Sequence, residues 1–182
     1  MWKILKQLVR TSTPNEAPPL VTGEWHSAHA QLQQQILTTL GRALCIRVVD
    51  AGSCNACELE IQALGNPYYN IEGLGIKFVA SPRHADMLLV TGPVSKNMEA
   101  ALKLAFDAMP DPKLVLAIGE CACNGGLFGA SYASCGQVSN VIDVDLTVPG
   151  CPPPPQDILR GILSALTAQS GSALPVIKNC AC

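Results

Sequence analysis

The sequence predicts an α/β fold built on a mostly parallel, doubly wound sheet. Short apolar runs rich in β-branched residues alternate with longer helical stretches along most of the chain. This order of elements builds a parallel sheet with right-handed crossovers. Three cysteine-containing segments directly follow strand-like runs. In open sheets of this kind, ligands bind at the carboxyl ends of the strands, so we expect the functional site there.

Residues 1–41 are expected to form an N-terminal extension made of a helix, a linker and a second helix. Residues 1–10 carry an apolar face that includes Trp2 and a basic face that includes Lys3. This pattern suits a helix lying in a membrane interface, and equally a terminal helix packed against protein. Residues 11–23 contain three prolines and are expected to be an extended linker.

A His-x-x-His spacing at His26 and His29 has two interpretations. The pair is either a metal site or the start of a helix that Ser27 caps. The second interpretation is favoured because no cysteine lies nearby. Apolar residues then recur every four positions, which predicts a helix over residues 28–44.

Residues 42–168 are expected to form one domain that contains the alternating elements. Apolar, β-branched-rich runs predict strands, whereas stretches with one apolar face predict helices. A tail at residues 169–182, rich in small residues, is expected to be irregular, and its Cys180 and Cys182 have no assigned role. The predicted strands are residues 45–49, 75–80, 86–91, 114–118 and 142–148, and the predicted helices are residues 58–64, 97–109 and 156–168.

Composition excludes several classes of protein. Only 14% of the 182 residues are charged, against about 25% in an ordinary soluble domain, so we expect much of the surface to contact partner subunits. A net charge of −2 gives no indication of nucleic-acid binding. No apolar stretch reaches the roughly 18 residues that span a bilayer, and the charged first ten residues do not resemble a secretory signal. Nine cysteines in a cytoplasmic chain are then expected to be metal ligands or buried thiols.

Four cysteines are expected to meet at one edge of the sheet. Cys54 and Cys57 form a C-x-x-C pair just after the first predicted strand, Cys121 follows the run 114–118, and Cys151 follows the run 142–148. Four thiolates are the usual ligand set of an iron–sulfur cluster. Glycines after Cys121 would let backbone approach the inorganic sulfide, and the prolines after Cys151 would form a stiff apolar wall. These features favour one iron–sulfur cluster.

Two other uses of these thiols remain open. A C-x-x-C pair near a βαβ unit is also typical of thioredoxin-like dithiol chemistry, and it can be half of a structural zinc site. Cys123 lies two residues from Cys121 and is an alternative third ligand. Cys45 and Cys135 are interpreted as small buried hydrophobic residues.

Four ordered motifs within residues 42–166 resemble nickel–iron hydrogenase small subunits and the related 20 kDa subunit of respiratory complex I. The motifs are DAGSCNACE at residues 50–58, SPRHADMLLVTG at 81–92, GEC at 119–121 with the later glycine pair, and PGCPP at 149–153. The C-x-x-C-Glu form resembles hydrogenases, because the complex I subunit has two adjacent cysteines there. Too few further cysteines remain for the extra clusters of uptake hydrogenases. The sequence therefore most resembles small subunits of membrane-bound, energy-converting (group 4) hydrogenases of the formate hydrogenlyase type.

This resemblance implies a flavodoxin-like core and one 4Fe–4S cluster held by Cys54, Cys57, Cys121 and Cys151. It also implies three kinds of partner: a large subunit with nickel and iron, a ferredoxin-like 4Fe–4S subunit, and antiporter-like membrane subunits. The chain would relay single electrons at the cytoplasmic side of the membrane and would make and break no substrate bond. The alternatives are a complex I-like subunit without nickel and, in another class, a zinc-stapled assembly module.

Two further residues are expected near the cluster by position in these motifs. Arg83 would approach the cluster and raise its potential, or else lie on the surface and pair with Asp86. Glu58 would lie beside the cluster, either as a neighbour of the ligands or as a group that handles protons, or else it would stabilise the N-terminus of its own helix.

Overall fold

The computed structural model describes residues 41–169 and, before them, the helical residues 27, 30, 31, 33, 34, 36 and 38. The expected amphipathic helix, linker and His26–His29 pair lie outside the described residues, as do Cys180 and Cys182. Ser27 is itself helical, and the predicted helix does not continue to residue 44, because Gly41 adopts a left-handed φ of +63° and a strand begins at Leu44. A left-handed glycine is a common way to end a helix.

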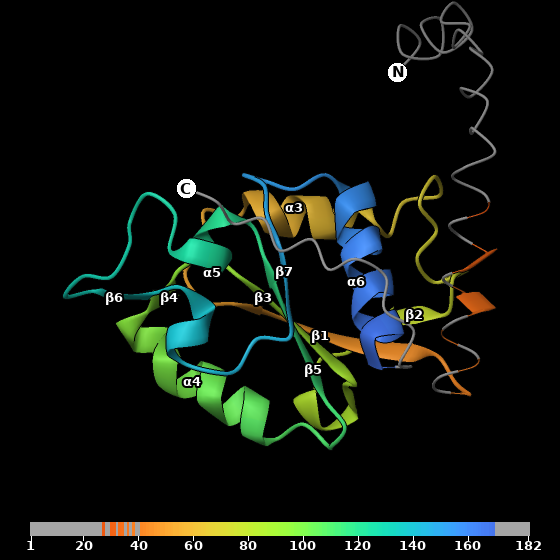
Figure 1. The fold of residues 1–182 in the computed structure, drawn as a ribbon, viewed down its shortest axis with the longest axis horizontal. Helices are drawn as coiled ribbons and strands as arrows, with labels where there is room; N and C mark the ends of the chain where they lie inside the picture. The colour runs from red at the N-terminus through yellow and green to blue at the C-terminus, as the bar shows by residue number, and fades with distance from the viewer. Residues whose placement is uncertain are drawn as a thin grey trace, which may run out of the picture.

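Five parallel strands form the main sheet, and their order confirms the predicted doubly wound fold (Figure 1). The strands lie in the order β2-β1-β3-β5-β7. If only the strands of this sheet are numbered, the order is 2-1-3-4-5, which is the order in flavodoxin-like proteins. All neighbouring pairs run parallel. The strands are β1 (Leu44–Asp50), β2 (Ile76–Phe78), β3 (Met87–Thr91), β5 (Leu114–Ile118) and β7 (Leu146–Val148).

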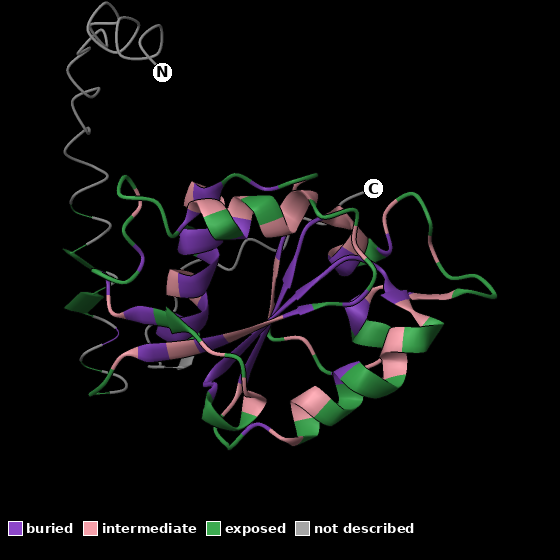
Figure 2. Cartoon of the chain, turned by 180° about the vertical axis from the view of Figure 1, so that it is seen from behind, coloured by how far each residue is buried: buried purple, intermediate pink, exposed green. Residues whose placement is uncertain are grey.

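The two faces of the sheet are covered by different helices. Along β3 and β5, alternate side chains point to opposite faces, as the period of two in a strand requires. Met87 and Leu89 belong to the hydrophobic core beneath α3 (Ala56–Ala63) and α6 (Pro155–Gln169). Leu88 and Val90 belong to the core beneath α4 (Lys96–Asp107). Figure 2 shows the buried strands in the centre and the exposed outer faces of the helices around them.

Burial on both faces explains why the central strands were predictable. Every residue of β3 and of β5 is buried, and strands covered on both sides have nearly continuous apolar sequences. The predicted boundaries of β1, β3, β5, α4 and α6 agree with the structure to within two residues. The predicted strand at residues 142–148 is shorter than expected, because Asp145 pairs with the backbone of Val115 and only Leu146–Val148 joins the sheet.

A second, small sheet lies beside the carboxyl edge of the main one. It pairs β4 (Val94–Ser95) with β6 (Ser134–Gly136) in antiparallel fashion. A short helix, α5 (Glu120–Asn124), lies between these two strands in the chain, and two 3₁₀ turns lie at Pro82–His84 and Val138–Asn140. None of these elements was predicted, because runs of two to five residues carry no readable periodicity.

Candidate iron–sulfur site

The first cysteine loop is shaped by Asp50, the last residue of β1. Its carboxylate oxygen accepts hydrogen bonds from the backbone N–H of Gly52 at 2.8 Å and of Ser53 at 2.7 Å. The hydroxyl of Ser53 in turn accepts the N–H of Asn55 at 3.0 Å. Such Asx turns replace the strand ladder with a tight loop. The chain therefore turns at once into α3 and places Cys57 in its first turn.

The other two cysteine segments are joined to each other at the same edge. The backbone N–H of Gly119 donates to the Val148 carbonyl at 2.8 Å, and that of Glu120 donates to the Gly150 carbonyl at 2.9 Å. These bonds extend the β5–β7 pairing beyond the strand ends. Cys121 therefore lies in the first turn of α5, directly beside the loop that carries Cys151.

Two glycines leave room for cysteine sulfur atoms. A Cβ at Gly119 would lie 2.6 Å from the Sγ of Cys57, and one at Gly126 would lie 2.7 Å from the Sγ of Cys121. Both separations are shorter than a side-chain contact allows. Both glycines also have positive φ angles, +90° and +55°, which favour glycine over any other residue. The backbone is thus fitted closely around two of the four thiols.

The other three candidate thiols are all electrostatic neighbours of Cys57. Burial first, and then the negative charges of Glu58, Cys54, Cys121 and Cys151, raise the pKa of Cys57 from 9.0 to about 12. The pKa of Cys121 is also raised, first by burial and then by neighbours that include Cys151 and Cys54. Cys57 and Cys121 are half-buried, whereas Cys54 and Cys151 are exposed. The site therefore opens to the surface on one side.

The other described cysteines point elsewhere. The Sγ of Cys123 lies 3.7 Å from the carbonyl oxygen of Ala117 and 3.6 Å from that of Val148, below the ends of β5 and β7. The Sγ of Cys135 donates to Glu99 at 3.3 Å on α4, and Cys45 contacts its own segment. Between the two candidates for the third position, this geometry favours Cys121 over Cys123.

Glu58 lies next to the thiols, whereas Arg83 does not. Both carboxylate oxygens of Glu58 are buried, and no described residue donates a hydrogen bond to them. Arg83 is exposed on the 3₁₀ turn that precedes β3, while the cysteines follow the strand ends, so it lies toward the opposite end of the strands. The expected pairing of Arg83 with Asp86 is wrong: Asp86 pairs with Arg42.

The donor set suits an iron–sulfur cluster. Four thiols are the ligands such a cluster needs, and they come from three loops at one edge, with glycines at two points of closest approach. Among the described residues, no group of three or more His, Cys, Asp or Glu side chains is arranged to hold a single metal ion.

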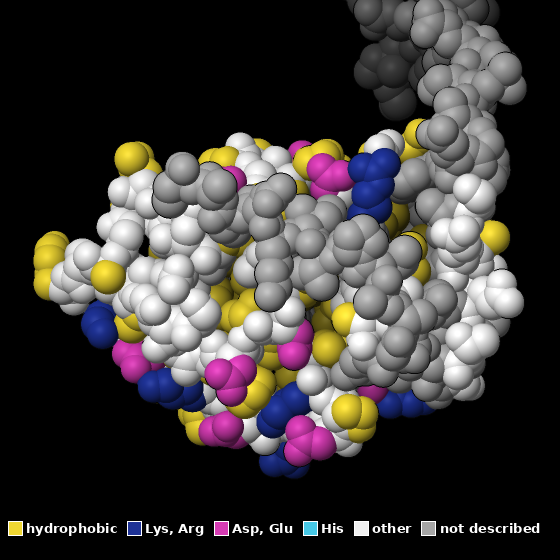
Figure 3. Space-filling view, in the orientation of Figure 1, with side chains coloured by type: hydrophobic (Ala, Val, Ile, Leu, Met, Phe, Trp, Pro, Cys, Tyr) yellow, Lys and Arg dark blue, Asp and Glu magenta, His cyan; other side chains and the backbone are white. Residues whose placement is uncertain are grey.

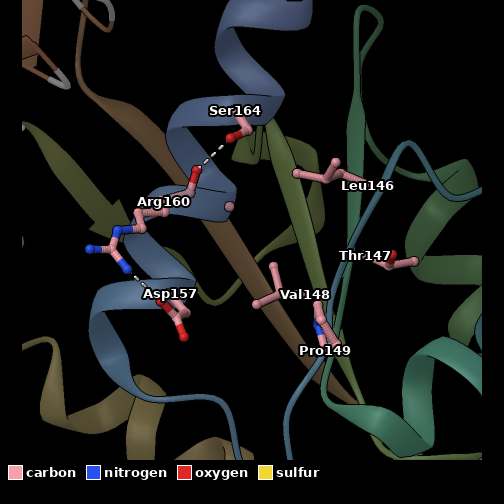
Figure 4. Close-up of a pocket in the computed structure, with 8 residues that line it drawn as sticks. Leu146, Thr147, Val148, Pro149, Asp157, Arg160 and Ser164 are labelled. Carbon is pink, nitrogen blue, oxygen red and sulfur yellow. Dashed lines mark hydrogen bonds and ion pairs between the residues drawn. The ribbon is translucent and has the colours of Figure 1, made fainter. Parts of the chain in front are cut away.

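A separate pocket of about 190 Å³ opens between β7 and α6, and no cysteine lines it (Figure 4). The side chains of Leu146 and Val148 lie on its sheet side. On the helix side, Arg160 pairs with Asp157 at 2.8 Å, and the hydroxyl of Ser164 donates to the Arg160 carbonyl. The pocket contributes no group to the thiol site.

Fold and site together define a flavodoxin-like protein with a four-cysteine site at the carboxyl edge of its sheet. The chain belongs to the family described as "NADH ubiquinone oxidoreductase, 20 Kd subunit", which matches residues 54–165. This match and those that follow confirm the resemblance to hydrogenase and complex I subunits. Members of this family are subunits of oxidoreductase complexes, and so is this chain.

Two relatives are hydrogenase or hydrogenlyase subunits by name. A "probable membrane-bound hydrogenase subunit mbhJ" of Pyrococcus furiosus is 46% identical over 132 residues, which cover 72% of this chain and 79% of that one. Formate hydrogenlyase subunit 7 of Escherichia coli is 40% identical over 75% of this chain, and the match spans 54% of that protein. A chain of a solved archaeal complex, the membrane-bound sulfane sulfur reductase, superposes with a TM-score of 0.63 at 30% identity, with 78% of each chain covered.

Two of these proteins belong to membrane-bound complexes by name. No helix among the described residues is long and apolar enough to cross a bilayer.

Proposed function

We propose that this chain is the electron-relay subunit of a membrane-bound nickel–iron hydrogenase complex of the formate hydrogenlyase type. The observation that carries this function is the gathering of Cys54, Cys57, Cys121 and Cys151 at one edge of the sheet. These four residues would hold one 4Fe–4S cluster. When bound, the cluster accepts and releases one electron at a time between the nickel–iron centre of a large subunit and a ferredoxin-like subunit.

The chain's own residues position and insulate this group. Cys57 and Cys121 enter from the first turns of two helices, and Gly119 and Gly126 keep Cβ atoms away from their sulfurs. The raised pKa of Cys57 means that its thiol must lose a proton when it becomes a ligand. Glu58 adds negative charge beside the site, which opposes the arrival of an electron and helps to set the reduction potential.

The complex would include antiporter-like membrane subunits, with this chain held peripherally on the cytoplasmic side. Support comes from the membrane-bound complexes named for two relatives and from the low share of charged residues, 14%. A complex I-like relay without nickel is the second candidate function. It is supported by the name of the matching family and by the sulfane sulfur reductase neighbour.

Nickel analysis of the intact complex separates these two functions. The complex is purified without air through a tag on this chain, and its nickel, iron and acid-labile sulfide are measured together with hydrogen evolution from a reduced viologen dye. We expect about one nickel per copy and hydrogen evolution. Iron and sulfide without nickel or hydrogen evolution would support the complex I-like relay, whereas zinc without sulfide would support the zinc-stapled module.

A further inference from the structure

A groove runs along one outer edge of the main sheet. It is the pocket of about 190 Å³ that opens between β7 and α6. Among the described strands, β7 pairs only with β5, so it is the last strand on its side of the sheet. An edge strand presents backbone N–H and C=O groups to whatever lies beside it. The groove is therefore suited to take up an extended segment of chain.

The surface that the groove offers is mainly apolar. Leu146 and Val148 line it from the sheet side, and Figure 3 shows hydrophobic side chains on this face between β7 and α6. The polar groups of the helix side pair with one another: Arg160 donates to Asp157, and Ser164 donates to the Arg160 carbonyl. A segment that fills this groove must therefore bring apolar side chains, because unpaired polar groups are costly to bury.

The sequence that follows α6 supplies such side chains. Residues 170–173 are Ser, Gly, Ser and Ala, residues 174–177 are Leu, Pro, Val and Ile, and no charged residue precedes Lys178 after the helix. This stretch lies outside the described residues. When residues 174–177 are extended, both of their faces are apolar, as in strands that are covered on two sides. Pro175 lacks an N–H, which an edge strand tolerates.

The groove and the apolar segment have the same length. Figure 4 shows Ser164 of α6 at the same end of the groove as Leu146 of β7. Asp157 lies toward the other end, where β7 leads into Pro149. The seven helical steps from Ser164 to Asp157 cover about 10 Å, and four extended residues also cover about 10 Å. Residues 174–177 can therefore line the groove from end to end.

The linker is long enough to bring this segment back to the groove. α6 ends at Gln169, which is about 7.5 Å beyond Ser164 at 1.5 Å per helical residue. Residues 170–173 span up to about 13 Å when extended, so the chain can reverse direction and reach the groove. A tether this short holds its segment at an effective concentration of about a millimolar. Modest apolar contacts are then sufficient to fill the groove.

Charge favours the same direction for the segment. A chain that enters at the end near Ser164 leaves at the end that Asp157 lines. Lys178 directly follows the apolar segment, so it arrives beside this carboxylate. The opposite direction would bring Lys178 to the apolar end at Leu146 and would require the linker to cross the whole groove first.

We propose that residues 174–177 occupy the groove as an added parallel strand beside β7, and that this places Cys180 next to Cys151. The segment then runs in the same direction as β7. Cys151 lies two residues beyond Pro149, and Cys180 lies three residues beyond the segment, so both thiols reach the same edge of the sheet. Cys151 is exposed there, and the tail covers it. This inference rests on the groove and does not depend on the proposed electron transfer.

Hydrogen–deuterium exchange of the intact complex tests whether the segment fills the groove. The complex is purified through a tag at the N-terminus of this chain, and exchange is measured for the peptide that contains residues 174–180. Ser164→Trp fills the groove, whereas Ala168→Trp changes an exposed residue of the same helix outside it. We expect exchange to be at least about tenfold faster in Ser164→Trp and unchanged in Ala168→Trp. Equal exchange in the wild type and Ser164→Trp would overturn the proposal.

Substitutions in the tail give the reciprocal readout without altering α6. Ile177→Asp places a charge in the groove and should speed exchange of the β7 amides, whereas Ser172→Asp changes only the linker and should not. Protection of β7 that survives Ile177→Asp would mean that a second copy or another subunit fills the groove, and the proposal would be wrong.

Cross-linking tests the position of Cys180. The full-length chain is prepared without metal, and Cys182→Ser leaves one thiol in the tail. A short bis-maleimide is added, and the joined peptides are identified by mass spectrometry. We expect a link between Cys180 and Cys151 that is lost in Ile177→Asp and kept in Ser172→Asp. A link that survives Ile177→Asp, or a Cys180 that joins only other cysteines, would contradict the placement.

Discussion

Gly119 and Gly126 stand where a side chain would collide with a cysteine sulfur. At Gly119 the added Cβ would lie 2.6 Å from the Sγ of Cys57, in a backbone with φ of +90°. We expect Gly119→Ala to displace Cys57 and to destabilise the chain by about 1–3 kcal/mol. The measurement is the low-temperature EPR signal of the reduced chain, which should be strongly reduced.

Gly129 provides the matched control for this substitution. It also has a positive φ, +54°, but nothing lies within 4 Å of its added Cβ. Gly129→Ala therefore carries backbone strain without the collision, and its EPR signal should persist. Equal losses for the two variants would show that strain, and not the sulfur contact, explains the effect.

The buried thiol of Cys57 should react slowly in the cluster-free chain. A pKa raised from 9.0 to about 12 lowers the thiolate fraction at pH 8 about a thousandfold, and only the thiolate reacts with iodoacetamide. Between pH 9 and 12 the Cys57 thiol keeps its proton in the folded state and loses it in the unfolded state. The alkylation rate of folded Cys57 should therefore keep rising with pH through this range. Residue-specific mass spectrometry gives the rate. A plateau near pH 9, as in the urea-unfolded chain, would contradict the raised pKa.

At the scale of elements, Asp86 ties the start of β3 to β1. Its carboxylate accepts the backbone N–H of Cys45 at 3.0 Å and pairs with Arg42, and the residue is only 9% exposed. Because the Arg42 side chain is 58% exposed, its ion pair adds little, and the buried N–H bond dominates. We expect Asp86→Ala to lower the free energy of unfolding in urea by about 2 kcal/mol.

The surface pair of Asp157 and Arg160 is the control for Asp86. The side chains of Arg160 and Asp157 are 62% and 45% exposed, so Asp157→Ala should change the free energy of unfolding by less than about 0.5 kcal/mol. A cost for Asp86→Ala as small as this would mean that the β1–β3 junction does not depend on the carboxylate.

The elements that the sequence predicted are those with a continuous chemical pattern. The strands at residues 45–49, 86–91 and 114–118 were correct to within one residue at each end, because burial on both faces requires uninterrupted apolar runs. The small sheet of β4 and β6 was missed, since Val94–Ser95 and Ser134–Gly136 are too short to show alternation. These elements are defined by the turns around them.

The candidate site, like the fold, was predicted only where the sequence carries a clear pattern. Spacing after strand ends pointed to the four thiols, because topology alone carries strand ends to one edge. The motif did not reveal that Arg83 lies on the turn before β3, because a motif does not show which end of a strand a turn occupies. The exposed apolar loop at residues 125–133 was not predicted, although the absence of charge from residue 121 to residue 142 can be read directly from the sequence.

At the scale of the whole molecule, the fold places two kinds of surface at one edge. Exposed thiols at Cys54 and Cys151 lie beside an ordered apolar loop, while the charged side chains of α4 lie on the helical face below it. A chain so poor in charge is suited to be enclosed by other subunits. This arrangement agrees with its membership of a family of oxidoreductase-complex subunits.

The most direct measurement is low-temperature EPR of the dithionite-reduced complex, purified without air, with iron and zinc quantified in the same samples. We expect a cubane signal in the wild type and its loss in Cys54→Ala, whereas Cys135→Ala should keep it because Cys135 bonds to Glu99 away from the site. A wild-type complex that contains zinc and gives no cubane signal, or equal loss of signal in both variants, would contradict a 4Fe–4S cluster on Cys54, Cys57, Cys121 and Cys151.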